Sequence, residues 1–250
     1  MWVSGIALCT VGNMSRGSFN CQRVGVLLSA GSFSPPTLMH LLSLEQAREY
    51  VENTLHHPVW KGFLSPVHDA YQKPGLVAAK HRLQMCALAV KDSDWVQVDA
   101  WEAQQPCYSP TFQVVQSLRE RLEAQRRLPD PGPSVFLVCG ADLVASMNNP
   151  SIWPVEHLQK LFALCEVVAL PRPALDATDE EALERVLRQY PAAIHYWKDA
   201  PVQCNISSTL VRERVAHGRS IRYLTPRAVE NYIWEHGLYR QTNPSIESAQ

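Results

Sequence analysis

Short apolar runs alternate with longer segments of helical periodicity along almost the whole chain, and this alternation restricts the fold more than any other feature. Residues 24–29 are apolar and β-branched and end at small residues, which is typical of a buried strand. Residues 38–53 follow, with Leu38, Leu41 and Ala47 near one face of a helix. Strands that alternate with helices in this way favour a parallel sheet covered by helices on both faces. We therefore predict an α/β fold with a Rossmann-like, doubly wound parallel sheet.

The same reasoning assigns the remaining segments. Further strands are predicted over residues 59–64, 95–98, 134–139, 167–170 and 193–196. Further helices are predicted over residues 76–90, 111–126, 155–164, 179–189, 207–217 and 226–235. Ligands of such folds bind beyond the carboxyl ends of the strands. We therefore expect the site at residues 31–40, after the first strand, and at residues 140–142, after the strand 134–139.

The length of 250 residues and the 46% share of hydrophobic residues suit one large core. We predict a flexible extension over residues 1–23, one domain over residues 24–240 and a flexible tail over residues 241–250. The first segment contains two arginines and no acidic residue, so a weak organelle-targeting segment is the alternative interpretation.

Charge, hydropathy and cysteine usage exclude several classes of function. The net charge is −1, which argues against a general nucleic-acid binder, and no apolar stretch is long enough to cross a membrane. The seven cysteines form no CxxC pair, which indicates reduced thiols of an intracellular protein. The nine histidines show no HExxH spacing, so we expect no metal site built from protein ligands.

The stretch GSFSPPTLMH, residues 31–40, carries the first chemical signal. Gly31 permits a sharp turn after the strand, and Ser32 and Thr37 bring hydroxyl groups to the start of a helix. A helix N-terminus favours anions, and His40 lies in its first turn. These residues fit a phosphate site with one imidazole directed at it. From this stretch alone, the favoured interpretation is an ordinary strand–turn–helix connection with His40 as a solvated first-turn residue, because short motifs have many false positives.

Further motifs follow in order: SPVHDAYQKPGL, WVQVDAWE, GAD, SIW, ISSTLVR and SIRYLTP. Together with GSFSPPTLMH, which resembles the (H/T)xxH signature with Thr37 in first position, they resemble the nucleotidyltransferase superfamily. Within it, they are similar to the eukaryotic nicotinamide-mononucleotide (NMN) adenylyltransferases. The resemblance runs from about Val24 to Tyr239 and implies a sheet of the nucleotidyltransferase type.

The resemblance implies the reaction. Enzymes of this family join NMN, and usually nicotinic acid mononucleotide (NaMN), to the AMP part of ATP, giving NAD or deamido-NAD and pyrophosphate. The attacking phosphate oxygen is already an anion, so the protein has to position the reactants and stabilise charge. We expect Mg²⁺ to be carried with ATP through phosphate oxygens and water.

The resemblance also implies the residues that contact ATP. His40 would meet the α- and β-phosphates, and Arg212 would hold the β- and γ-phosphates at the helix that begins with Ser207; these two are the predicted catalytic residues. In many relatives a lysine stands where this chain has Leu210, so one positive charge is missing. Asp142 would accept hydrogen bonds from ribose. The ATP-binding residues predicted in this way are Gly31, Ser32, Phe33, Thr37, His40, Gly140, Asp142, Ser207, Ser208, Thr209 and Arg212.

The resemblance assigns a second group of residues to NMN and NAD. Trp153 and Tyr108 would stack on the charged pyridine ring, and relatives in vertebrates carry a tryptophan in place of Tyr108. Lys73 and Arg172 would meet the NMN phosphate. The NMN-binding residues predicted in this way are Ser32, Phe33, Tyr71, Lys73, Tyr108, Thr111, Ile152, Trp153 and Arg172.

Two other functions stay open from the sequence. Another adenylyl- or cytidylyltransferase, for example one acting on phosphopantetheine, would keep the phosphate motifs without needing stacking faces at Trp153 and Tyr108. A catalytically silent nucleotide-binding or chaperone-like protein is the non-enzymatic alternative.

The stretch 126–133 carries no Lys/Arg-rich block of the nuclear-import kind, so we expect a cytoplasmic protein, with the nucleus as the alternative. A homo-oligomer is compatible with the sequence.

Overall fold

The computed structural model describes residues 23–125, 132–173 and 175–240. Apart from Arg23, the predicted extension over residues 1–23 lies outside the described residues, as do the tail over 241–250 and residues 126–131 of the proline-rich loop. Cys9 and Cys21 also lie outside them.

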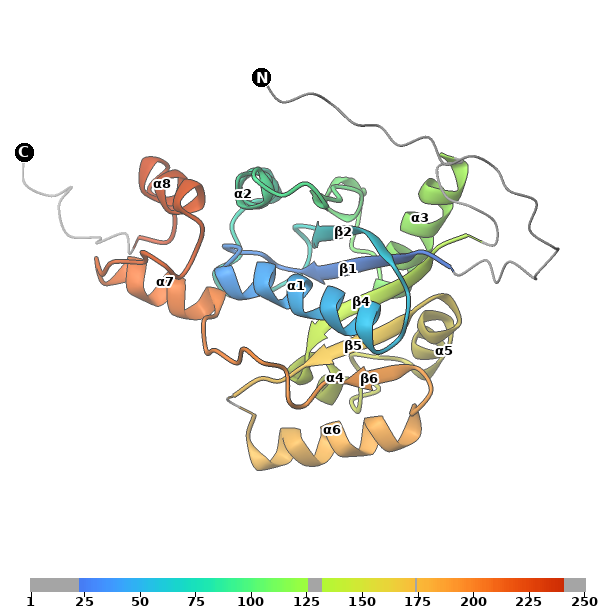
Figure 1. Cartoon of the computed structure of the whole chain (residues 1–250). Coiled ribbons are helices and arrows are strands. Elements are labelled where there is room, and N and C mark those ends of the chain that lie inside the picture. The colour runs from blue at the N-terminus through green and yellow to red at the C-terminus, as the bar shows by residue number, and fades with distance from the viewer. Residues whose placement is uncertain (1–22, 126–131, 174, 241–250) are drawn as a thin grey trace, which may run out of the picture.

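The described residues form the predicted α/β fold, with one six-stranded, fully parallel sheet in the order β3-β2-β1-β4-β5-β6 (Figure 1). The strands are β1 (Gly25–Gly31), β2 (Val59–Pro66), β3 (Val96–Val98), β4 (Ser134–Gly140), β5 (Glu166–Leu170) and β6 (Ile194–Tyr196). Each predicted strand is present, and its ends differ from the prediction by at most two residues.

Helices cover both faces of this sheet. They are α1 (Leu38–Asn53), α2 (Ala79–Val90), α3 (Thr111–Ala124), α4 (Ala141–Ser146), α5 (Val155–Leu164), α6 (Ala177–Gln189), α7 (Ser208–Ala216) and α8 (Arg227–Glu235), with a 3₁₀ turn η1 (Glu102–Gln104). The prediction that a helix starts at Leu76 is wrong, because residues 76–78 belong to a loop held by tertiary hydrogen bonds. Neither α4 nor η1 was predicted, since both are too short to show a helical period.

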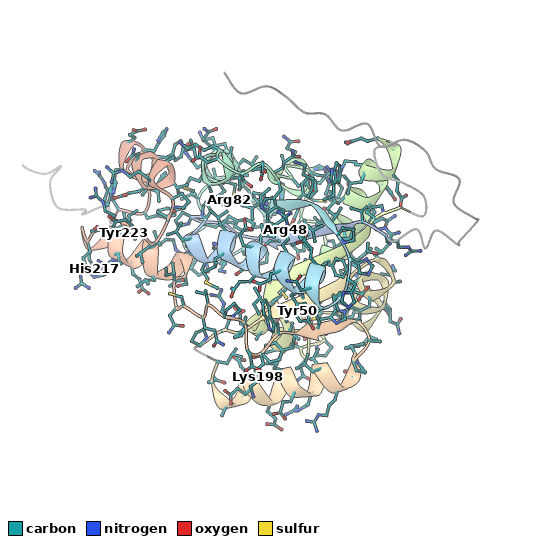
Figure 2. All side chains as sticks on the ribbon, in the orientation of Figure 1. Arg48, Tyr50, Arg82, Lys198, His217 and Tyr223 are labelled. Carbon is teal, nitrogen blue, oxygen red and sulfur yellow. The ribbon has the colours of Figure 1, made fainter. Side chains whose placement is uncertain are left out.

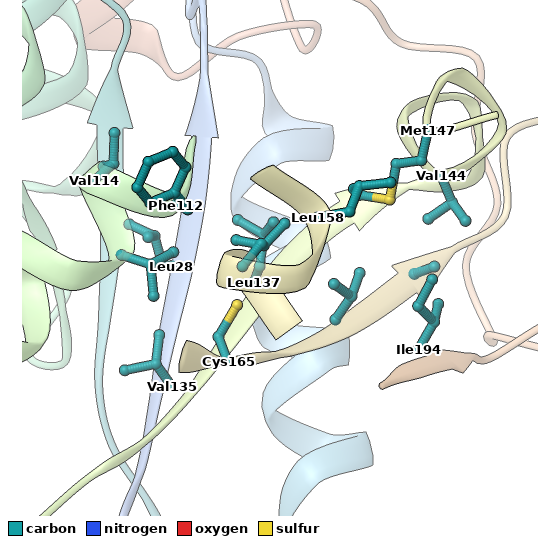
Figure 3. Close-up of a cluster of buried hydrophobic side chains, with 14 of the residues drawn as sticks. Leu28, Phe112, Val114, Val135, Leu137, Val144, Met147, Leu158, Cys165 and Ile194 are labelled. Atoms are coloured by element: carbon teal, nitrogen blue, oxygen red, sulfur yellow. The ribbon is translucent and has the colours of Figure 1, made fainter. Parts of the chain in front are cut away.

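Side chains of each strand alternate between the two faces, as the pleat requires. Val26 and Leu28 of β1 point into the core under α3, α4, α5 and α6, which Figure 3 shows in part. Leu27, between them, points into the core under α1 and α2. Because both faces are buried, the strands are almost continuously apolar, which is the pattern that the sequence shows.

A third core cluster joins α2, α7 and α8 beside the sheet. It is formed by Met85, Val211, Val215, Ile221, Val229 and Ile233. In Figure 1, α7 and α8 lie on the side to which the carboxyl ends of the strands point. The cluster therefore attaches the last part of the chain next to the edge where a ligand is expected.

The strand order changes direction between β1 and β4. The chain runs outward from β1 through β2 to β3, and then from β4 through β5 to β6 on the other side. The two connections leave a crevice at the carboxyl ends of β1 and β4, which is where open parallel sheets bind ligands. Across the described residues, no helix is long and apolar enough to cross a membrane.

Candidate active site

The segment Gly31–Thr37, here called the phosphate loop, leaves β1 at this crevice and leads into α1. Its backbone is sharply turned at Phe33, which has a φ of 42°, and the Ser34–Pro35 peptide bond is cis. The Phe33 ring is buried and meets the His40 ring edge-on, with 5.1 Å between ring centroids. Phe33 therefore contributes a packed side chain behind the loop, and only its backbone is placed to face a ligand.

His40 lies in the first turn of α1 and caps it. The backbone N–H of Thr37 donates to His40 Nδ1 at 2.9 Å, and Thr37 Oγ1 lies 2.8 Å from the same nitrogen. An amide N–H can only donate, so Nδ1 is an acceptor and the ring proton sits on Nε2. Burial, together with the nearby cations of Arg172 and Lys73, lowers the pKa of His40 to about 4. The ring is thus a neutral donor at neutral pH.

Two cavities flank the carboxyl ends of β1 and β4. The smaller, of about 60 Å³, is lined by Val138 and Leu170 from the α1 face of the sheet. The larger, of about 530 Å³, is lined by Leu137 and Phe112 from the opposite face. A separate hollow of about 480 Å³ over the start of α1 and α8 includes none of the predicted site residues.

Most of the predicted residues line one of the two cavities. Those that line neither are Phe33, Asp142, Ser207, Ser208, Thr209 and Arg212. Thr37, His40, Gly140 and Arg172 line the smaller one, together with Cys204 and Ile206. The larger one is lined by Gly31, Ser32, Tyr71, Lys73, Tyr108, Thr111, Ile152 and Trp153. Arg172, which the resemblance assigns to NMN, lines the smaller cavity. Gly31 and Ser32, which it assigns to ATP as well, line the larger one.

Aromatic side chains line the larger cavity. The rings of Tyr71 and Tyr108 stack with 5.9 Å between centroids and 22° between planes. Trp153 Nε1 donates to Ser146 Oγ at 3.0 Å, which fixes the orientation of the indole ring. Lys73 lies in the same cavity, and its pKa is lowered by burial and by the nearby Arg212 cation. The cavity therefore combines aromatic faces with one cation, which suits a flat, positively charged ring linked to a phosphate.

Gly140 and Asp142 lie where β4 passes into α4. Asp142 is a first-turn residue of α4, and its Oδ1 accepts from Arg172 Nε at 3.3 Å. A Cβ atom at Gly140 would collide with the Asp142 carboxylate and approach Arg172 within 3.0 Å. A larger residue at position 140 would therefore displace the Asp142 and Arg172 side chains from this arrangement.

The N-terminus of α7 faces the phosphate loop. Ser207 Oγ caps the helix by accepting from the backbone N–H of Leu210 at 3.1 Å, as predicted. Ser208 Oγ donates to the carbonyl of Pro35 at 2.8 Å. Arg212 donates through Nη1 to the Ser34 carbonyl at 3.0 Å and through Nη2 to Thr209 Oγ1 at 3.2 Å. In this structure Arg212 thus holds the loop backbone, from one turn inside α7.

Sequence reasoning missed Arg82 of α2, which is labelled in Figure 2 and has no exposed surface. It donates to the carbonyls of Val77 at 2.8 Å and Ser32 at 3.3 Å, and to Asp69 Oδ1 at 2.8 Å. Arg82 therefore ties the phosphate loop to the segment His68–Ala78, here called the Lys73 loop. A charged residue within an amphipathic helix gives no sequence signal of such a role.

Glu102 of η1 was missed as well. It lines the larger cavity although only 2% of the residue is exposed, and burial raises the pKa of its carboxyl to about 7. The charge of Glu102 in turn helps to raise the pKa of Tyr108. Among the residues that the structure describes, no group of three or more His, Cys, Asp or Glu is arranged to hold a metal ion.

Comparisons with known proteins agree with this architecture. A model of the cytidylyltransferase-like family matches residues 28–214. A nicotinamide/nicotinic acid mononucleotide adenylyltransferase from Arabidopsis thaliana is 37% identical over 216 residues, covering 86% of this chain and 90% of that protein. Nicotinamide/nicotinic acid mononucleotide adenylyltransferase 1 from Bos taurus is 36% identical over 248 residues, covering 86% of this chain and 88% of that protein.

Two solved structures share the fold. One is Plasmodium falciparum nicotinic acid mononucleotide adenylyltransferase complexed with NaAD, with a TM-score of 0.60 at 16% identity, covering 87% of this chain and 98% of that chain. The other is a nicotinate-nucleotide adenylyltransferase candidate from Vibrio parahaemolyticus, with a TM-score of 0.55 at 18% identity, covering 88% of this chain and 97% of that chain.

Proposed function

Because the chain belongs to the cytidylyltransferase-like family and, within it, to the nicotinamide/nicotinic acid mononucleotide adenylyltransferases, we propose that the crevice between β1 and β4 binds both reactants of the adenylyl transfer. The enzyme is a nucleotidyltransferase that makes NAD or deamido-NAD. ATP is the adenylyl donor, and a pyridine mononucleotide is the acceptor.

One observation carries this assignment of sites: the carboxyl ends of β1 and β4 separate a cavity containing His40 from a cavity containing Lys73 and aromatic rings. ATP enters on the His40 side, where Gly140 and Arg172 also lie. The acceptor enters on the other side, with its ring between Tyr108 and Trp153 and its phosphate near Lys73. The phosphate loop lies between the two reactants.

In the reaction, the phosphate oxygen of the mononucleotide forms a bond to the α-phosphorus of ATP. The bond from that phosphorus to the bridging oxygen breaks, and pyrophosphate leaves with the electron pair. His40 donates from Nε2 to an oxygen of the reacting phosphates, because Nδ1 accepts from the Thr37 backbone and the single proton of the neutral ring is on Nε2. Arg172, Lys73 and Arg212 supply the positive charge that offsets the phosphates.

Mg²⁺ enters with ATP as part of the substrate, bridging phosphate oxygens.

We place the protein in the cytoplasm, with the nucleus as the alternative, because no Lys/Arg-rich block of the nuclear-import kind stands between residues 126 and 133. Small molecules are its proposed partners; nucleic acid and membranes are not, and a homo-oligomer remains compatible with these roles.

The test is a direct assay of purified protein with Mg-ATP and either NMN or NaMN, read as NAD formed and as pyrophosphate released. We expect turnover with at least one acceptor, and the ratio of the two rates gives the base preference. Turnover with phosphopantetheine alone would replace the acceptor assignment. Nucleotide binding without turnover on any acceptor would favour a silent binding or chaperone-like protein.

A further inference from the structure

Ser34, in the phosphate loop, is the meeting point of three segments that are far apart in the sequence. Its Oγ lies 2.9 Å from the carbonyl of Gly75, 3.2 Å from the backbone nitrogen of Val77 and 3.0 Å from the hydroxyl of Tyr239. Ser34 is 1% exposed, so water does not compete for these contacts. The hydroxyl of Ser34 thus joins the phosphate loop to the Lys73 loop and to the segment after α8.

The chemistry of these atoms fixes the direction of each bond. The Gly75 carbonyl can only accept, so Ser34 uses its one proton there. The Val77 N–H can only donate, and it fills one of the two acceptor positions of Ser34. The Tyr239 hydroxyl must therefore donate to the remaining position. With this bond every hydrogen-bonding position of the Ser34 hydroxyl is used, and without it one acceptor position inside the protein is left empty.

Tyr239 is held in an unusual conformation to reach Ser34. Its φ is 62°, in the left-handed region that bulky residues rarely adopt, and Gly237, two residues earlier, has a φ of 59°. The Tyr239 ring packs against the third core cluster, between α2, α7 and α8. A strained backbone at a residue with a specific polar contact points to a role for that contact.

The Ser34 contacts lead directly to residues that meet substrate. Gly75, whose φ is 75°, lies against the Arg212 guanidinium so closely that a Cβ there would come within 2.5 Å of Nε. Lys73 lies two residues before Gly75. Arg212 in turn donates to the Ser34 carbonyl. A shift of Ser34 would therefore move the phosphate loop, Lys73 and Arg212 relative to one another.

We propose that Tyr239 is a positioning residue for adenylyl transfer, whose hydroxyl holds Ser34 so that the phosphate loop and the Lys73 loop present their groups to the two reactants in register. This inference rests on the proposed function of the crevice. It gives the last residues of the described chain a part in catalysis, although Tyr239 itself touches no substrate. Displacement of a reacting group by about 1 Å can cost about a hundredfold in rate, so a modest loosening of the Ser34 contacts is measurable.

The experiment compares Tyr239→Phe with Tyr223→Phe. Tyr223 is a matched control, because it also has a positive φ, of 65°, but is 78% exposed and projects from the α7–α8 end of the molecule (Figure 2). We expect Tyr239→Phe to lower kcat/KM by about threefold to tenfold, the range for loss of one hydrogen bond. We expect Tyr223→Phe to leave kcat/KM unchanged.

Two further measurements separate positioning from simple stabilisation. In a Ser34→Ala background, Tyr239→Phe should cause no further loss of kcat/KM, since its partner is already gone. Amide hydrogen exchange at Gly75–Val77 should speed up in Tyr239→Phe and not in Tyr223→Phe. A lower melting temperature with unchanged kcat, KM and exchange at Gly75–Val77 would overturn the proposal, as would full additivity with Ser34→Ala.

The exchange measurement needs no turnover, so it stands apart from the proposed function. A protein without adenylyltransferase activity that still loses protection at Gly75–Val77 would refute the function while leaving the contact intact. An active enzyme that shows no change at Gly75–Val77 would refute the role of Tyr239 and leave the function intact.

Discussion

His40 has a different task at each ring nitrogen. Nδ1 accepts from the Thr37 backbone and closes the first turn of α1, while Nε2 carries the proton that faces the smaller cavity. The helical spacing predicted the position of His40 but not its role as a cap, because capping depends on the conformation of Thr37. Substitution of His40 therefore affects both helix stability and phosphate binding, and the two effects have to be separated.

Three substitutions of His40 separate them. Alanine removes both the acceptor for Thr37 N–H, which caps α1, and the N–H donor to phosphate. Glutamate keeps the acceptor but carries no donor. Glutamine keeps an acceptor and a donor. We expect alanine and glutamate to lower kcat by about 10²–10³-fold, the range for one lost donor to a charged transition state, and glutamine to lose less. We expect alanine alone to lose about 1 kcal/mol of stability. Steady-state assays and thermal melts measure the two effects, and recovery of activity by glutamate would mean that His40 serves only as a cap.

Glu102 shows how a buried acid makes stability depend on pH. Its carboxyl has a pKa of about 7 in the folded protein, against 4.5 for an ordinary glutamate, so the folded state keeps this proton as the unfolded state loses it. The unfolded state therefore binds fewer protons between these values, and stability falls as pH rises through this window. Below pH 4.5 both states are protonated and the penalty is absent.

Glu102→Gln should remove this penalty, because glutamine stays neutral and can still accept from the backbone of His68. We expect the variant to be more stable than the parent by about 1–3 kcal/mol at pH 8, with the difference vanishing near pH 4. Chemical denaturation at several pH values measures it. Glu156→Gln, at an exposed position in α5, is the matched control. A gain that is equal at pH 4 and pH 8 would contradict ionisation of Glu102 as the cause.

At the scale of elements, sequence patterns predicted what depends on local periodicity. The helix over residues 38–53 was predicted with the bounds that α1 has, because its apolar residues recur over four turns and the two prolines before it fix the start. The α2 prediction began three residues too early. Leu76 and Val77 are apolar and fit the helical period, but the Val77 backbone is held by Ser34 and Arg82 instead.

The candidate site was predictable to the same extent. Of the residues carried by motifs, Gly140 lines the smaller cavity, Trp153 lines the larger one and Ser207 caps α7. Their contacts with substrate stay predictions. The roles of Arg82 and Tyr239 could not be predicted, since Tyr239 meets Ser34 across 205 positions and neither contact leaves a periodic pattern. Arg172 lines the smaller cavity, while Lys73 lines the larger one. The sequence could not show this, because it places Arg172 after β5 without showing which face of the sheet it reaches, and its predicted contact with NMN stays a prediction.

At the scale of the whole molecule, three core clusters give regions of unequal stability. The clusters on the two faces of the sheet share β1, β2, β4 and β5, while the third contains six buried residues and joins α2, α7 and α8 beside the sheet. Regions with fewer buried apolar contacts open at lower free energy. The third cluster also holds Ser207 and Arg212 against the phosphate loop, so its opening would dismantle part of the ATP site.

Native-state hydrogen exchange should reveal this difference. We expect amides of α7 and α8 to exchange through a partial opening well before those of β1 and β4, and ATP to slow exchange in α7 most. Mass spectrometry of peptides spanning these elements, with and without Mg-ATP, measures both effects. Equal protection of α7 and β1 in the free protein would show that the third cluster opens only with the whole molecule.

The described chain begins near the amino ends of the strands and ends near their carboxyl ends. Arg23 stands before the amino end of β1, and Tyr239 contacts the phosphate loop beyond its carboxyl end, a separation of about 20 Å for a strand of this length. An affinity tag, dye or surface linker fused ahead of Arg23 is thus attached near the amino ends of the strands, away from the candidate active site. One fused directly after Arg240 departs next to Tyr239, which contacts Ser34. Arg23 and Arg240 are therefore not equivalent as attachment points for immobilisation, and Arg23 is the one to use.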